Sequence, residues 1–393
     1  MENKMSKKSK RELAIQVQKR YRKATKTQKS LILDEFVAST GYNRKYAIRL
    51  LKTDLESKKS KKPKTGRPIK YSARIISLLE RLYEISNYIC AQRLQPFLPE
   101  LIDILEKKGE MVIFSEEKAL LCTMSSATIN RVLRPYRKKL DGKGKTMTKP
   151  GTILKKQIAI RTGMDWDDHR PGFIEIDCVA HCGQSAAGDF FHTLTATDIC
   201  TGWTENFILR HKTMQAVVEA MGKLENLLPF PILGIDSDNG SEFINELLYK
   251  FCSDRQNKII FTRSRPYQKN DQAHVEQKNW AIVRKFLGYH RFCTDEHFLL
   301  IDKIFSLNHI YLNFFQPIRK TFHEPVSDGK ERIYYDTAAT PFRRAIKYSE
   351  VSTKMRARLF NTYYSSNPVT LITDIRKSIL LLNESSSYAV IQD

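Results

Sequence analysis

Three acidic residues between positions 172 and 287 lie where a strand-and-helix fold would bring them together. Asp177 lies inside a run of alternating apolar and β-branched residues, which predicts a buried strand. Asp238 ends a second such run and directly precedes an Asn-Gly turn that leads into a helix. Glu276 lies on the first turns of a helix that begins after a long polar loop. The three carboxylates are therefore candidates for one site.

Carboxylates in mid-strand, at a strand's end and on a helix can converge on one metal centre. Hard oxygen ligands of this kind suit Mg²⁺ or Mn²⁺. Two such ions bind a phosphodiester, because one activates the attacking oxygen and the other stabilises the leaving oxygen. Asp236 is an alternative to Asp238 as the second ligand, since residues two apart on a strand share a face.

Four ordered sequence blocks carry a specific resemblance to a known family. They are 172–177, 197–203, 236–243 and 269–279. Together they resemble the catalytic core of the retroviral-integrase superfamily and, more narrowly, the transposases of bacterial insertion sequences. The resemblance covers residues from about Pro171 to about Arg291. It implies a ribonuclease H-like core that uses Mg²⁺ or Mn²⁺.

The resemblance implies that Asp177, Asp238 and Glu276 are the catalytic, metal-binding triad. Successive members are separated by 60 and 37 residues, and the second gap is close to that of the family. Asp238 is preferred to Asp236 because the family's aspartate stands directly before Asn-Gly.

The loop before Glu276 carries further residues that the resemblance implies in DNA binding, namely Tyr267, Lys269 and Gln272. Tyr267 as a simple turn residue and Gln272 as a helix cap are an equally supported interpretation. Integrases often carry lysine on the helix face that follows the glutamate. Here Trp280 and Val283 stand on that helix instead, which puts this DNA contact in question.

The order of elements predicted for the core is three strands, a helix, a strand, a helix, a strand and a helix. The strands are expected at 172–179, 190–199, 203–209, 231–238 and 258–263, and the helices at 213–228, 241–255 and 272–288. This order is expected of a ribonuclease H-like mixed sheet. Asp198 ends the second strand, and by the resemblance it is a hairpin residue and not a metal ligand.

Positive charge is concentrated ahead of this acidic core. The formal net charge of the 393 residues is +23. Residues 1–70 hold 22 Lys and Arg against 6 Asp and Glu, whereas residues 151–290 hold 16 against 17. Such a division is expected where one part of a protein binds phosphates and another cuts them.

Residues 1–56 are predicted to form a helix-turn-helix DNA-binding domain, with a turn at Ser39-Thr40-Gly41. Its second helix would present Asn43, Arg44, Lys45 and Arg49 to a major groove. An ordinary helical hairpin is the alternative.

Residues 57–70 form a basic linker. In it Arg67 lies within Gly-Arg-Pro, which suits an A·T-rich minor groove, and a plain solvated tether is equally supported.

Residues 71–140 are predicted to form a second helical domain that breaks near Pro96 and Pro99 and ends in another helix-turn-helix. Its last helix carries the DNA-binding candidates Thr128, Arg131 and Arg134. The two arginines could instead pair with acidic residues at 116–117. A linker at 141–165, the integrase-like core at 166–291 and a mainly helical C-terminal extension at 292–393 follow. Within the extension, helices are expected at 296–315, 349–358 and 371–382 and an irregular arm at 324–341.

Cysteine and histidine positions limit other metal chemistry. Cys178, His181 and Cys182 cluster, but without a second pair at metal spacing they indicate strand-end packing more than zinc. No histidine precedes His169, so the His-His-Cys-Cys domain that begins retroviral integrases is absent from this sequence. This favours the bacterial transposase branch.

No apolar run approaches membrane-spanning length, and residues 1–4 lack a signal-peptide core. Seven scattered cysteines fit reduced thiols. We therefore expect a cytoplasmic protein without a membrane partner, associated with the bacterial nucleoid.

The expected function is that of a DNA transposase. It would bind double-stranded DNA, both the terminal inverted repeats and the target, and would cut and transfer strands. Coordinated cutting of two ends predicts a homodimer or higher oligomer on DNA. The alternatives are a DNA-binding regulator derived from a transposase and a metal-dependent nuclease without strand transfer.

Overall fold

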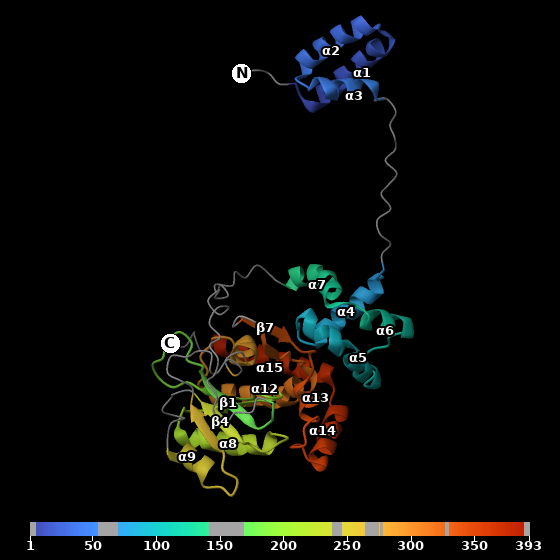
Figure 1. The fold of residues 1–393 in the computed structure, drawn as a ribbon. Helices are drawn as coiled ribbons and strands as arrows, with labels where there is room; N and C mark the ends of the chain where they lie inside the picture. The colour runs from blue at the N-terminus through green and yellow to red at the C-terminus, as the bar shows by residue number, and fades with distance from the viewer. Residues whose placement is uncertain are drawn as a thin grey trace. The chain divides into compact units, whose positions relative to one another are not determined.

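The computed structural model describes residues 5–53, 70–140, 169–237, 246–263, 275, 278–326 and 330–388. The chain divides into two compact units, 1–70 and 71–393 (Figure 1). No helix in these described stretches combines the length and the apolarity needed to cross a bilayer.

The first unit is a bundle of three helices. They are α1 (Lys7–Lys23), α2 (Lys26–Thr40) and α3 (Arg44–Lys52). Phe36 of α2 and Leu51 of α3 are buried in its apolar core. α2 ends because Gly41 adopts φ +69°, a left-handed conformation that favours glycine. The side chain of Asn43 accepts a hydrogen bond from the backbone N–H of Lys45 and so caps α3.

A block of four helices begins the second unit. They are α4 (Ala73–Ile85), α5 (Ala91–Lys107), α6 (Ser115–Cys122) and α7 (Ser126–Leu140). The break predicted near Pro96 and Pro99 is wrong, because α5 continues through both prolines. A buried face that includes Leu94, Leu98 and Leu101 compensates for the hydrogen bonds that the prolines cannot donate.

A five-stranded mixed sheet lies at the centre of the second unit. Its strands are β1 (Phe173–Ala180), β2 (His192–Asp198), β3 (Thr204–Leu209), β4 (Gly234–Ser237) and β5 (Ile260–Arg263), in the order β3-β2-β1-β4-β5. β1, β2 and β3 are antiparallel, whereas β4 and β5 run parallel to β1. Helix α8 (Met214–Leu227) precedes β4, and α9 (Glu246–Ser253) precedes β5. The element order predicted for residues 172–263 is confirmed by these strands and helices.

Gly172 fixes the start of β1. Its φ is +114°, and a Cβ at this position would lie 2.6 Å from the carbonyl oxygen of Pro231, so only glycine fits. The close approach lets the carbonyl of Gly172 accept a hydrogen bond from the N–H of Leu233 at 2.8 Å. This contact aligns β1 with β4.

The chain after β5 returns as a helix beside β1. The described part contains a π-helical turn, η2 (Asn279–Arg284), and then α11 (Lys285–Leu287). Val283 and Leu287 are fully buried against apolar residues of α12 (Asp295–Phe315) and of the sheet.

The C-terminal extension is mainly helical. After α12 it contains β6 (Thr321–Val326), β7 (Lys330–Tyr335), α13 (Pro341–Ala345), α14 (Thr353–Ser365) and α15 (Pro368–Tyr388). The irregular arm predicted at 324–341 is partly wrong, because β6 and β7 pair as an antiparallel hairpin. Its described side chains are largely exposed, so the alternation of buried and exposed positions that identifies strands is weak. Figure 1 shows the sheet between α8 and the pair α12 and α15.

The helical block packs directly on this extension. The buried hydroxyl of Tyr311 donates to the carbonyl of Ile85 at 2.7 Å, and the amide of Gln316 donates to the carbonyl of Ser86 at 3.0 Å. Arg343 and Glu100 form an ion pair at 2.8 Å. Residues of the block, the sheet and the extension belong to one continuous apolar core. The orientation of α7 is therefore mechanically linked to that of the sheet.

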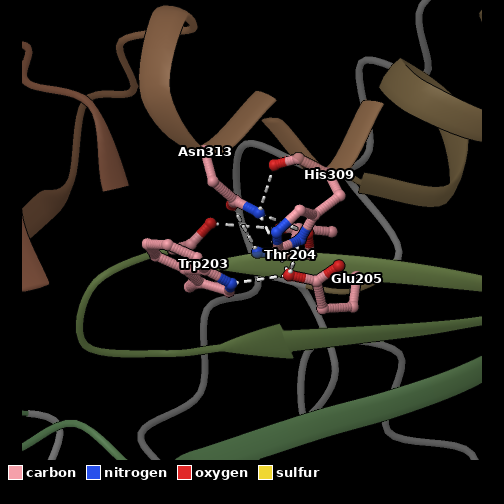
Figure 2. Close-up of polar contacts among 6 residues, drawn as sticks. Trp203, Thr204, Glu205, His309 and Asn313 are labelled. Atoms are coloured by element: carbon pink, nitrogen blue, oxygen red, sulfur yellow. Dashed lines mark hydrogen bonds and ion pairs between the residues drawn. The ribbon is translucent and has the colours of Figure 1, made fainter. Parts of the chain in front are cut away.

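A buried polar cluster joins edge strand β3 to α12 (Figure 2). The carboxylate of Glu205 accepts hydrogen bonds from the indole N–H of Trp203 at 2.6 Å and from the amide of Asn313 at 3.2 Å. Nδ1 of His309 lies 2.7 Å from the same carboxylate oxygen. Burial alone would lower the pKa of His309, but the charge and hydrogen bond of Glu205 outweigh it and the net pKa is raised. Three partners thus satisfy a carboxylate that is only 2% exposed.

We predict that Glu205→Gln destabilises the protein most at low pH. Because the pKa of His309 is raised in the folded state, its contribution is complete below the ordinary value and is lost as pH rises through the raised value. Losing this charge-assisted bond should cost about 1.5–3 kcal/mol at pH 5. Urea unfolding between pH 5 and 9 measures the effect, with exposed Glu219→Gln as the control. A gap between wild type and Glu205→Gln that does not change with pH would contradict this.

Candidate active site

Asp177 is held in β1 by hydrogen bonds to both carboxylate oxygens. Oδ1 accepts from the backbone N–H of Cys178 at 2.7 Å, and Oδ2 accepts from Nδ2 of Asn279 at 2.6 Å. Asn279 is 7% exposed and lies at the start of η2. Both contacts orient the carboxylate, because hydrogen bonds to an ionised group are short and strong.

Two more acidic side chains lie beside Asp177 on the sheet. Glu175 is fully buried, and its Oε2 accepts from the backbone N–H of Val275 at 3.0 Å. It shares a strand face with Asp177, and its partner across β1 and β4 is Asp236. Asp236 is 8% exposed and accepts from Oγ1 of Thr262 at 2.7 Å. Sequence reasoning missed Glu175, although an acidic residue inside a predicted buried strand was a usable signal.

Three side chains hold the η2 segment and the chain after it against β1 and the loop that follows. Besides the Asn279–Asp177 bond, the guanidinium of Arg284 donates to the carbonyl of Ala180 at 3.0 Å. Arg291 donates to four carbonyls, those of Cys182, Ser185, Ala187 and Asp189. The helix is thereby fixed in position alongside the strand that carries Asp177.

Asp198 has a structural role. Its two carboxylate oxygens accept from the N–H of Gly172 at 2.8 Å, and from the N–H and hydroxyl of Thr201 at 2.7 and 2.6 Å. Burial raises the pKa of Asp198 to about 6 despite these donors. The carboxylate ties the β2–β3 turn to the start of β1, as expected of a hairpin residue.

The structure places only part of the predicted site. Asp177 is described, whereas Asp238, Glu276, Tyr267, Lys269, Gln272 and Arg67 lie outside the described residues. Within the described ranges, no three His, Cys, Asp or Glu side chains gather closely enough to hold a metal ion. Cys178, His181 and Cys182 are among the described residues that form no such group. His181 is fully buried with its Nε2 2.7 Å from the hydroxyl of Thr193, an arrangement of packing.

The DNA-binding candidates in the first unit differ in their surroundings. Lys45 and Arg49 are exposed on α3, and the guanidinium of Arg49 lies 5.5 Å from the centre of the Tyr46 ring. The guanidinium of Arg44 contacts Asp34 and the hydroxyl of Ser30, so its charge is partly neutralised. The side-chain oxygen of Asn43 is used in the cap of α3, as described above.

In the second unit, the candidates lie on α7. Ser125 caps this helix by accepting from the N–H of Thr128 at 3.2 Å. Arg131 and Arg134 are exposed, and Arg131 contacts the hydroxyl of Thr128 at 3.5 Å. The alternative pairing with residue 117 is wrong, because Glu117 pairs with Arg74 at 2.5 Å.

Comparison with known proteins gives one informative relative. No protein-family model matches the chain. Two solved structures have TM-scores of 0.29. The HTLV-2 integrase catalytic core in complex with magnesium is 17% identical and covers 41% of this chain and 93% of its own, and the BIV integrase catalytic core is 16% identical and covers 45% and 94%. Similarity at so low a TM-score does not establish the fold or the function of this chain.

The uncharacterized protein y4rM of Sinorhizobium fredii (strain NBRC 101917 / NGR234) is 36% identical to this chain over 341 residues. The match covers 83% of this chain and 95% of that protein. The chain therefore belongs to the same protein family as y4rM.

Proposed function

We propose that this protein is a DNA transposase of the insertion-sequence class, which binds the ends of its element and cuts and joins DNA strands with divalent metal ions. One observation carries the proposal. Two residues that flank Glu276 in the sequence, Val275 and Asn279, donate hydrogen bonds to Glu175 and Asp177 of β1. Val275 and Asn279, one residue before and three residues after Glu276 in the sequence, thus both contact the strand that carries Asp177.

The register of the sheet supports the same convergence for the second aspartate. Ser237 of β4 pairs with Ile176 of β1. The next residues in the sequence are Asp238 and Asp177. A parallel pair that continues by one residue would set these two carboxylates on adjacent strands.

The carboxylate oxygens near Asp177 are of the ligand type that a hard divalent cation prefers, but the described carboxylates alone form no metal site. The described side chains beside Asp177 include the carboxylates of Glu175 and Asp236, and oxygen ligands suit Mg²⁺ or Mn²⁺. We assign the metal ligands to Asp177, Asp238 and Glu276. When bound, two such ions activate the attacking oxygen and stabilise the leaving oxygen.

In the proposed reaction, the protein's own residues orient the carboxylate of Asp177 and hold its backbone in place. Asn279 fixes the carboxylate of Asp177, and the sheet fixes its backbone.

Water first attacks the phosphorus at the 3′ end of the element and releases a 3′-hydroxyl. That hydroxyl then attacks a target phosphodiester, so one bond forms for each bond broken and no external energy is needed. Both steps are in-line displacements, and one site serves both.

DNA binding is assigned to α3 of the first unit, to α7, and to residues of the loop before Glu276. Exposed Lys45, Arg49, Arg131 and Arg134 provide cations for phosphates. Two element ends must be cut together, so the active form on DNA is a dimer or a higher oligomer.

Removing any triad carboxylate should abolish strand cleavage. We expect Asp177→Asn, Asp238→Asn and Glu276→Gln each to lower Mg²⁺-dependent cleavage of element-end duplexes at least about 1,000-fold, because the metal ligand is lost. End binding, measured by fluorescence anisotropy, should be retained. Exposed Asp302→Asn is the matched control.

Four outcomes would change the assignment. Full cleavage activity in Asp177→Asn would contradict the assignment of the catalytic triad. Binding without any cleavage by the wild-type protein would favour the regulator. Cleavage of intact element ends, with no joined product formed from a pre-cut end, would favour a nuclease. Greater loss in Asp236→Asn than in Asp238→Asn would exchange those two aspartates.

Asn279→Ala should reduce cleavage without reducing DNA binding. Loss of the bond to Oδ2 removes one of the contacts that orient the Asp177 carboxylate, and losing such a supporting partner of a metal ligand typically costs about 10- to 100-fold in metal affinity or activity. The Mn²⁺ dependence of the cleavage rate measures this. Raised Mn²⁺ should partly restore the rate, and an unchanged rate in Asn279→Ala at limiting Mn²⁺ would contradict the positioning role.

Cations on α3 should contribute unequally to end binding. Lys45→Ala and Arg49→Ala should each reduce the slope of log affinity against log salt by about 1, because each releases one phosphate contact. Arg44→Ala should change the slope less, since Asp34 and Ser30 already engage its guanidinium. Anisotropy titrations at several salt concentrations provide the measurement. An Arg44→Ala effect equal to that of Lys45→Ala would contradict this ranking.

A further inference from the structure

We propose that Trp280, Arg284 and Tyr289 form a stacking platform for an unpaired DNA base beside the active site. The inference rests on the proposed function and adds a substrate-binding element to it. We call these three residues the aromatic platform.

Both aromatic members of the platform are unusually exposed. Trp280 is 65% exposed and Tyr289 is 68% exposed. Among the described residues, the side chain of Trp280 has no hydrogen-bond partner and no ring contact. The guanidinium of Arg284 lies 4.8 Å from the centre of the Tyr289 ring, within cation–π range. An exposed indole costs solvation free energy unless a ligand covers it.

The platform is fixed to the strand of the active site. Asn279, the neighbour of Trp280, bonds to Asp177, and Arg284 bonds to the carbonyl of Ala180 at the end of β1. The platform therefore cannot shift along β1 without breaking these contacts.

The backbone between the two anchors is a π-helical turn. The N–H of Lys285 donates to the carbonyl of Trp280, five residues back. Turns of this kind are rare in proteins, but those that occur are frequently found at functional sites. They change the direction in which successive side chains point along a helix. Here Asn279 is buried toward Asp177 while Trp280 is exposed. The turn thus allows adjacent residues to serve the metal ligand and the solvent-facing platform.

The chemistry of the platform matches a nucleobase. Aromatic rings stack on any base, and an arginine adds cation–π attraction and a contact for phosphate. Both strand cleavage and strand transfer act on a DNA end, where a base can leave the stack at small cost. A base seated on Trp280 would lie on the same helical segment that holds the Asp177 carboxylate through Asn279. The same face could instead bind a second copy of the chain, and the experiment separates the two.

The test uses the full-length protein and duplexes that carry 2-aminopurine in a short single-stranded 3′ tail, with EDTA present to prevent cutting. Stacking on an indole quenches 2-aminopurine fluorescence. We expect the wild-type protein to quench it, Trp280→Ala to lose the quenching, and Trp280→Phe to retain most of it. Affinity for the tailed duplex should fall about 5- to 100-fold in Trp280→Ala, the range measured for one base–aromatic stack. Affinity for a blunt duplex should not change.

Two controls make each result decisive. Asp177→Asn should quench as the wild-type protein does, so a failure of catalysis leaves the platform intact and the two proposals can fail separately. Circular dichroism should show the fold of Trp280→Ala unchanged, because the side chain is exposed. Equal quenching by wild type and Trp280→Ala would overturn the proposal. The proposal would also be overturned if Trp280→Ala kept the quenching but changed its oligomeric state, as measured by light scattering.

Discussion

The hydrogen bond between Asn279 and Asp177 is the contact on which the site depends. It joins the helix after β5 to the middle of β1, and the bond between Val275 and buried Glu175 repeats the connection four residues earlier. Buried carboxylates are costly unless such donors satisfy them. The helix and the strand are therefore held in one register by groups whose separation would leave charge buried and unpaired. This constraint fixes Val275 and Asn279 beside β1.

A second set of buried polar contacts determines what lies around the sheet. Glu205 binds α12 to the edge of the sheet, and Tyr311 of the same helix binds the α4 end of the helical block. Helix α12 thus connects β3 with residues 71–140 through directional bonds in addition to apolar packing. Such bonds specify one geometry because a buried group without its partner loses stability. The relation between α7 and the sheet follows from this connection.

Local pattern predicted the sheet and the long helices of the extension well, but it missed the β6–β7 hairpin. Alternation around Asp177 and the Asn-Gly turn after Asp238 are properties of neighbouring residues, so the strands and their order could be read directly. The course of α5 through Pro96 could not, because the compensation comes from packing distant in sequence. Asn279, Glu175 and Thr262 were missed for a similar reason. Their roles depend on pairs about 100 and 26 residues apart, which no periodicity reveals.

On the proposed mechanism, phosphates and bases are bound by different parts of the chain. Positive charge is concentrated in residues 1–70, away in sequence from the carboxylates, and supplies contacts to the DNA backbone. An indole beside the site binds a base through its ring face and adds no formal charge of its own. Trp280 can therefore contribute affinity for an unpaired base that does not depend on charge, whereas the phosphate contacts of residues 1–70 weaken as the salt concentration rises.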